Sequence, residues 1–206
     1  MKIKDACKQE YAKRISSLHF NIENAIIEYF MLCEIDALRK SFILDSLTIF
    51  AMQSQLLCLE IIIQSIKKDF CLLVWCLCCD TDTKANTIPK LKNAVIREYF
   101  DTPNLIKVAT PNSKGGIMSA LDYARKKYIA HHDFEATFGR ISLDDLFVKF
   151  KEYVKVYNSV IFGEFKLTHV ISETKLSALR NKAHSGILHL LNGDMLKFFK
   201  AIGEEK

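Results

Sequence analysis

The chain has few of the residues that interrupt helices, because only three prolines and seven glycines are spread over 206 residues. It also lacks the polar and apolar alternation that half-buried β-strands require. Long stretches are filled instead by Leu, Ile, Phe, Ala, Lys and Glu. These absences argue against a sheet protein and predict an all-α fold in a single domain over residues 1–206.

A membrane-spanning segment and a secretory signal are also missing from the pattern. The apolar run from Phe70 to Cys79 is bounded by charged residues and falls well short of the roughly 20 apolar residues that a span needs. No secretory signal precedes the cysteines. We therefore expect a soluble, cytoplasmic protein that does not interact with membranes.

The seven cysteines do not form a pattern typical of disulfides or zinc sites. Four of them crowd into one apolar helical run. Cys76 and Cys79 form a CxxC, but no second pair stands at a matching spacing to complete four zinc ligands. We interpret these thiols as reduced core residues and expect neither a metal nor a cofactor. The four are Cys71, Cys76, Cys78 and Cys79.

The net charge of +5 is too mild to indicate a nucleic-acid binder by itself. The distribution is more informative, because residues 84–127 contain nine cations and only three acids. If folding gathers these cations on one face, a phosphate backbone is attracted to it. The alternative is a solvated basic surface, and the sequence leaves both readings open.

Apolar residues repeat at helical spacing along most of the chain. The segment 42–66 is expected to be a central, largely buried helix, and residues 70–79 either continue it or form a separate helix. Asn86 and Thr87 belong to a loop that caps the next helix. The helices are predicted at about 15–33, 42–66, 88–100, 116–131, 143–161 and 172–191, with a short terminal helix ending near 202.

The segment RKKYIAHHD, residues 125–133, places an arginine, two histidines and an acid at the end of a helical pattern. A guanidinium forms planar, bidentate hydrogen bonds to phosphate and stays charged. A histidine can take a proton from a ribose 2'-hydroxyl and return one to the leaving oxygen. Asp133 can orient a neighbouring imidazole. Together these groups suffice for RNA cleavage without a metal.

This segment resembles the signature of HEPN domains (higher eukaryotes and prokaryotes nucleotide-binding), in which four to six residues separate an Arg from a His. Arg125 and His131 enclose five residues. The preceding run WCLCCDTDTKANTIPKLKNAV, residues 75–95, is similar to the abortive-infection AbiU-type branch, in which an Asp and an Asn-Thr pair lie between the helices. The similarity covers roughly residues 21–160.

The resemblance implies an antiparallel bundle of about six to seven helices, with a HEPN-like core at about 21–160 and C-terminal helices at about 168–202. It implies a homodimer that acts as a metal-independent endoribonuclease in phage defence or a toxin–antitoxin system, with RNA as substrate and an antitoxin protein as a further partner. Arg125 becomes the phosphate-binding residue and His131 the general acid/base. The accessory candidates are Lys126, Tyr128, His132 and Asp133.

Three alternatives remain open. On an ideal helix, His132 nearly eclipses Arg125 whereas His131 lies about 120° away, so either imidazole can complete the pair if the helix ends or bends there. Arg180 and His184 stand four residues apart on a later helix and echo the motif. Many active HEPN members carry Asn, Asp or His where this chain has Lys126, which favours a non-catalytic module that binds nucleotides or protein. His169 and His189 have no partner that the sequence indicates.

Overall fold

The computed structural model describes residues 3–41, 53–100, 106–131 and 141–190. These segments contain seven α-helices, one 3₁₀ turn and one π-helical turn, and their only β-type pairing is an isolated bridge between Ile3 and Phe100. The predicted all-α class is therefore confirmed for this part of the chain. None of the described helices is both long and apolar enough to cross a lipid bilayer.

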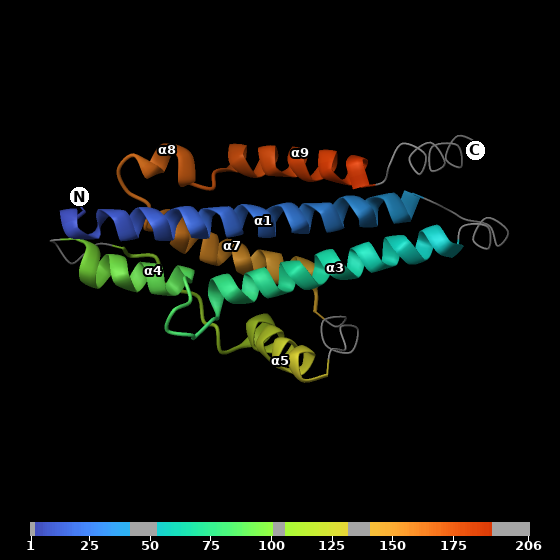
Figure 1. Cartoon of the computed structure of the whole chain (residues 1–206), viewed down its shortest axis with the longest axis horizontal. Coiled ribbons are helices and arrows are strands. Elements are labelled where there is room, and N and C mark those ends of the chain that lie inside the picture. The colour runs from blue at the N-terminus through green and yellow to red at the C-terminus, as the bar shows by residue number, and fades with distance from the viewer. Residues whose placement is uncertain (1–2, 42–52, 101–105, 132–140, 191–206) are drawn as a thin grey trace. The chain divides into compact units, whose positions relative to one another are not determined.

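The helix positions follow the predicted order (Figure 1). The predicted break near residue 69 is absent, because one helix runs through the charged residues 67–69. A five-residue helix that the sequence analysis did not predict precedes the last described one, and the predicted terminal helix near 202 lies outside the described residues. The elements are η1 (Asp5–Cys7), α1 (Lys8–Ser41), α3 (Gln53–Cys78), α4 (Ile88–Ala94), η2 (Val95–Tyr99), α5 (Gly116–His131), α7 (Leu143–Ser159), α8 (Phe165–His169) and α9 (Glu173–Leu190).

Local chemistry explains where several helices begin. The Thr87 hydroxyl accepts a hydrogen bond from the backbone N–H of Lys90, and Pro89 lies in the first turn of α4, where its missing N–H costs nothing. The Ser142 hydroxyl accepts from the N–H of Asp145 at 3.3 Å at the start of α7. Gly116 begins α5 with φ at +56°, a conformation that side chains with a Cβ rarely adopt.

The described chain divides into two compact units. Unit 1 comprises Met1–Ala25 and Cys71–Glu173, and unit 2 comprises Ile26–Phe70 and Thr174–Lys206. Helices α1 and α3 each contribute residues to both units. Whether the chain folds as the single domain predicted from its length stays a prediction, so each unit is described by itself.

Unit 1 is organised around α7, whose apolar face is buried and packs against α4 and α5. The first part of α1 runs antiparallel to α7. The Tyr11 hydroxyl donates to the carbonyl of Val160 at 2.8 Å, and the Tyr157 hydroxyl donates to the carbonyl of Ile15 at 3.4 Å. Both tyrosines are fully buried, and burial raises the pKa of Tyr11 to about 12, so each remains a neutral donor.

Two backbone features shape the end of unit 1 that contains α4. The turn η2 is π-helical, so its backbone is wider by about one residue than an α-helical turn. Lys92 is almost fully buried, and its ammonium donates to the Val108 carbonyl at 2.5 Å and to the Thr110 hydroxyl at 3.2 Å. This lysine therefore attaches the segment leading to α5 to the side of α4.

Unit 2 contains the second part of α1, most of α3, and α9. Its core includes Leu32 and Ile35 of α1 and Leu179 of α9. The prediction of a largely buried helix over 42–66 is wrong for part of its described portion, because Leu57 and Ile61 are each more than 60% exposed. A helix that is apolar on several sides can bury only those that face neighbouring elements.

Candidate functional site

The predicted catalytic arginine lies on α5, within unit 1. Arg125 is half-buried, and its guanidinium carbon lies 3.8 Å from the centre of the Trp75 ring. This is a close cation–π contact, in which the ring covers the face of the guanidinium. Among the described residues, the guanidinium makes no hydrogen bond or ion pair. Its N–H groups therefore remain free to bind an anion.

A hydrogen-bonded carboxylate holds the tryptophan under Arg125. The Trp75 indole N–H donates to one oxygen of Asp122 at 3.0 Å, and the Lys126 ammonium donates to the other at 2.7 Å. The hydrogen bond from Lys126 is the main cause that lowers the pKa of Asp122, and Trp75 and Arg125 act in the same direction. Lys126 is thus paired with Asp122, while Arg125 rests on the ring.

The predicted acid/base residue lies on the same helix as the arginine. Helix α5 continues to His131, so its backbone separates Arg125 and His131 by six residues, which is about 9 Å along the axis and about 120° around it. The side chains of Tyr128 and His131 lie outside the described part, as do residues His132 and Asp133 altogether. The approach of an imidazole to Arg125 therefore stays a prediction.

The second candidate pair lies in unit 2 and has protein partners. Arg180 and His184 are exposed on α9, as their spacing predicted. The Arg180 guanidinium carbon is 5.6 Å from the centre of the Phe30 ring, and Nδ1 of His184 lies 3.1 Å from a carboxylate oxygen of Glu34. These contacts attach α9 to α1 and are sufficient to explain the presence of both residues.

The prediction that the cysteines lie in the core is wrong for one residue. The six described cysteines are free thiols, and Cys71 and Cys78 are buried, but Cys76 is exposed. Cys76 lies about 140° around α3 from Cys71, on a different face. The described residues contain no group of three or more His, Cys, Asp or Glu side chains placed to bind a metal ion.

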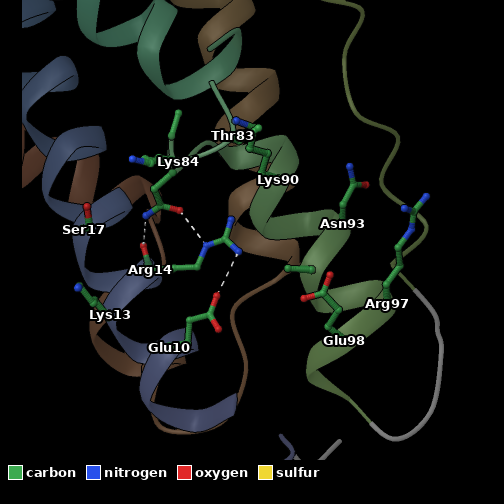
Figure 2. A pocket seen from close by; sticks show the side chains of 13 residues that line it. Glu10, Lys13, Arg14, Ser17, Thr83, Lys84, Lys90, Asn93, Arg97 and Glu98 are labelled. Atoms are coloured by element: carbon green, nitrogen blue, oxygen red, sulfur yellow. Dashed lines mark hydrogen bonds and ion pairs between the residues drawn. The ribbon is translucent and has the colours of Figure 1, made fainter. Parts of the chain in front are cut away.

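A polar pocket in unit 1 was missed by the sequence analysis. Its volume is about 530 Å³, and it is lined by the start of α1, the loop before α4, and α4 with η2 (Figure 2). Five of its lining side chains are cationic and two are carboxylates, Glu10 and Glu98. The cations are Lys13, Arg14, Lys84, Lys90 and Arg97.

Arg14 is fixed at the centre of this pocket by hydrogen bonds. Its Nε donates to the side-chain oxygen of Asn86 at 3.1 Å, and Nη1 donates to the Tyr99 hydroxyl at 3.1 Å. Asn86 donates in turn to the backbone carbonyl of Arg14 at 2.9 Å, and the Tyr99 hydroxyl donates to Glu10 at 2.7 Å. Burial and this bond to Glu10 raise the pKa of Tyr99 and keep the phenol protonated.

Part of this pocket was visible in the sequence. Lys84, Lys90 and Arg97 belong to the basic stretch over residues 84–127, and Asn86 is half of the Asn-Thr pair noted in the AbiU-type resemblance. The α1 residues carry no such signal, because they lie about 70 positions earlier in the chain. Only the packing of α1 beside α4 brings the two groups together.

A histidine pair in unit 1 was also missed. The rings of His19 and His169 lie 4.7 Å apart, and Nδ1 of His169 is 2.6 Å from the Thr168 hydroxyl. Nε2 of His19 lies 3.1 Å from Glu23. The expectation that His169 has no partner is therefore wrong.

Comparisons with protein-family models, with curated proteins and with solved structures find no match to this chain. Any functional assignment rests on its own residues and their geometry.

Proposed function

We propose that this chain is a HEPN-type, metal-independent endoribonuclease that acts in phage defence or a toxin–antitoxin system. The observation that carries the proposal is the state of Arg125. Its aromatic face contact with Trp75 fixes the guanidinium while leaving its N–H groups unpaired within the described chain. An arginine held in this way can bind a phosphate without breaking an existing ion pair.

The proposed reaction uses the substrate's own ribose as nucleophile. His131 removes the proton of a 2'-hydroxyl, the 2'-oxygen forms a bond to the adjacent phosphorus, and the bond from phosphorus to the 5'-oxygen breaks. The leaving 5'-oxygen takes up a proton, giving a 2',3'-cyclic phosphate and a 5'-hydroxyl. Arg125 stabilises the negative charge that grows on the phosphate oxygens.

A second copy of the chain completes this proposal. One histidine cannot act as base and acid at the same moment, and general acid–base help contributes roughly 100- to 10,000-fold. A homodimer that brings two Arg125/His131 pairs to one RNA strand supplies both roles. His132 and Asp133 are proposed to assist the imidazole, and Tyr128 and Lys126 are the remaining accessory residues.

The second candidate function is a non-catalytic module that binds nucleotides or a protein such as a toxin partner. The pairing of Lys126 with Asp122 favours this candidate. Lys126 occupies the position after the motif arginine, and an ammonium cannot accept the hydrogen bond that an amide or carboxylate accepts there.

The deciding experiment is incubation of the purified full chain with RNA in EDTA. The wild type is expected to produce fragments with 2',3'-cyclic phosphate ends, and His131→Ala is expected to lose at least about 100-fold in cleavage rate. His189→Ala, which removes an exposed histidine of α9, serves as the matched control and should retain full activity. Circular dichroism checks that both variants keep their helices.

Two outcomes would contradict the proposal. Intact RNA at high protein concentration would exclude cleavage and favour the binding module. Equal cleavage by the wild type and His131→Ala would exclude His131 as the acid/base residue. Toxicity on expression that Arg125→Ala relieves would support the nuclease in cells.

A further inference from the structure

The pocket around Arg14 has an excess of positive charge that the described protein does not neutralise. Its five cations and two carboxylates give a formal net charge of +3. Lys13, Lys84 and Arg97 are exposed and form no ion pair with any described residue. Cations gathered in one hollow repel one another, and a bound anion removes that repulsion.

Arg14 differs from these exposed cations because it is already fixed. Its side chain is only 20% exposed, and the bonds to Asn86 and Tyr99 occupy Nε and Nη1. Its second terminal nitrogen, Nη2, has no hydrogen-bond partner among the described residues. In Figure 2 the side chain extends from α1 toward α4, so this donor is held in place before any ligand arrives.

The acid nearest to Arg14 is not a strong competitor for an incoming anion. Glu10 lies 3.8 Å from Nη1 of Arg14 and accepts a shorter hydrogen bond of 2.7 Å from the Tyr99 hydroxyl. Tyr99 therefore holds the carboxylate to one side. Lys90 donates to the backbone carbonyl of Asp82 rather than to a carboxylate, so its charge is not cancelled either.

The remaining lining residues indicate what kind of anion fits. They include the hydroxyls of Ser17 and Thr83 and the amide of Asn93, and no aromatic residue is among the thirteen that line the described pocket. The pocket thus offers hydrogen-bond donors and charge but no stacking surface for a base. Its volume of about 530 Å³ lies within the range of small-molecule sites.

We propose that this pocket binds a triphosphate group through Arg14 and the surrounding cations, whether the group is free or carried by a nucleotide. Several negative charges on one short chain match several cations around one hollow, and guanidinium and ammonium groups both bind phosphate oxygens. The site is separate from Arg125 and does not depend on RNA cleavage.

The test is calorimetric titration of the full chain with inorganic triphosphate at low and moderate salt. The wild type is expected to bind with a Kd below about 1 mM, and the affinity should fall as salt rises. The double variant Lys84→Gln with Arg97→Gln should bind at least about tenfold more weakly, because two charge-assisted contacts are lost. Glu98→Gln should bind more tightly, because it removes a negative charge from the lining.

The matched control removes two charges elsewhere in unit 1. Lys107 and Lys114 are exposed, have no ion pair among the described residues, and lie outside the pocket lining. Lys107→Gln with Lys114→Gln therefore lowers the net charge by the same amount and should change the Kd by less than about twofold. Equal loss in the two double variants would overturn the proposal, because the binding would then follow net charge alone.

Two further ligands separate the sources of phosphate. ATP should bind about as tightly as inorganic triphosphate, and a gain of more than about tenfold would overturn a site specific for the phosphates alone. A single-stranded RNA with a 5'-hydroxyl should not compete with triphosphate. Failure of the wild type to bind triphosphate overturns this proposal and leaves the Arg125 nuclease intact, whereas inactive protein that still binds triphosphate has the opposite meaning.

Discussion

Two arginines of unit 1 are held by opposite parts of the same functional group. Arg14 is held at its edge, where Asn86 and Tyr99 accept hydrogen bonds from its nitrogens. Arg125 is held at its face, where the Trp75 ring lies 3.8 Å away. Edge contacts fix the direction of the guanidinium but use its donors, whereas a face contact fixes the plane and leaves the donors unused.

The difference separates a structural contribution from a binding contribution. Removing Arg14 leaves two polar partners in a half-buried environment without their hydrogen bonds. Removing Arg125 leaves an aromatic ring exposed on one face and strands no polar partner in the described chain. We therefore expect Arg14 to contribute more to stability, and Arg125 to contribute mainly to ligand binding.

The largest predicted effect tests this distinction directly. Arg14→Leu should lower the free energy of unfolding by about 2 to 3 kcal/mol, because Asn86 and Tyr99 lose a charged donor. Arg125→Leu should lower it by less than about 1 kcal/mol, the range of a partly exposed cation–π contact. Urea unfolding followed by circular dichroism measures both, with Lys13→Leu, at an exposed position of α1, as the control.

Equal losses for the two arginines would remove the distinction between edge and face contacts. A large loss in the Lys13→Leu control would show instead that leucine itself is poorly tolerated on this surface of α1.

A carboxyl group in unit 2 extends the comparison to a polar side chain without a partner. One oxygen of Glu28 is buried and has no hydrogen-bond partner among the described residues. Burial, with a smaller effect from Asp69, raises the pKa of Glu28 from its ordinary value of 4.5 to about 7. The folded chain therefore binds this proton more tightly than the unfolded chain does.

The sign of the pH dependence follows from that shift. Between pH 4.5 and about 7 the folded state holds the extra proton, so stability falls as the pH rises through this window, and the penalty is complete above it. Glu28→Gln should stabilise the protein by about 1 to 2 kcal/mol at pH 8, after allowance for partial exposure, and by almost nothing at pH 4.5. Thermal unfolding at both pH values measures the difference.

The exposed carboxyl of Glu164 provides the control for this experiment. Glu164→Gln should leave stability nearly unchanged at both pH values. A stabilisation by Glu28→Gln that is the same at pH 4.5 and pH 8 would contradict the pKa argument.

The smallest predicted effect concerns the ion pair beside Arg125. Lys126→Ala removes an exposed contact with Asp122 and should change the free energy of unfolding by less than about 0.5 kcal/mol. The pKa of Asp122 should rise, because the hydrogen bond from Lys126 is the main cause that lowers it. An NMR titration of the Asp122 carboxyl checks this, and an unchanged pKa would contradict the assignment.

The sequence predicted features that depend on neighbouring residues. The Ser142 cap and the glycine that begins α5 identify helix ends from a few adjacent positions, and the order of the helices followed from apolar spacing. It also placed Arg125 and His131 on one helix. The supporting Trp75 could not be predicted, because it lies 50 positions earlier and reaches Arg125 only through packing within unit 1.

The Arg14 pocket shows the same boundary more strongly. Its cations come from two segments separated by a long stretch of chain, and the bonds to Asn86 and Tyr99 depend on the position of α1. A basic stretch in the sequence indicated only Lys84, Lys90 and Arg97. A π-helical turn has no simple residue pattern, so the orientation of Tyr99 was beyond prediction as well.

That wide turn has a consequence for how the chain tolerates change. Because η2 contains one residue more than a regular turn needs, deleting a single residue from Val95–Tyr99 would restore ordinary helical winding and rotate everything after it by about 100°. The Tyr99 phenol would then swing away from Glu10 and Arg14. Length variation of one residue, harmless in most surface loops, would here dismantle an internal hydrogen-bonded junction.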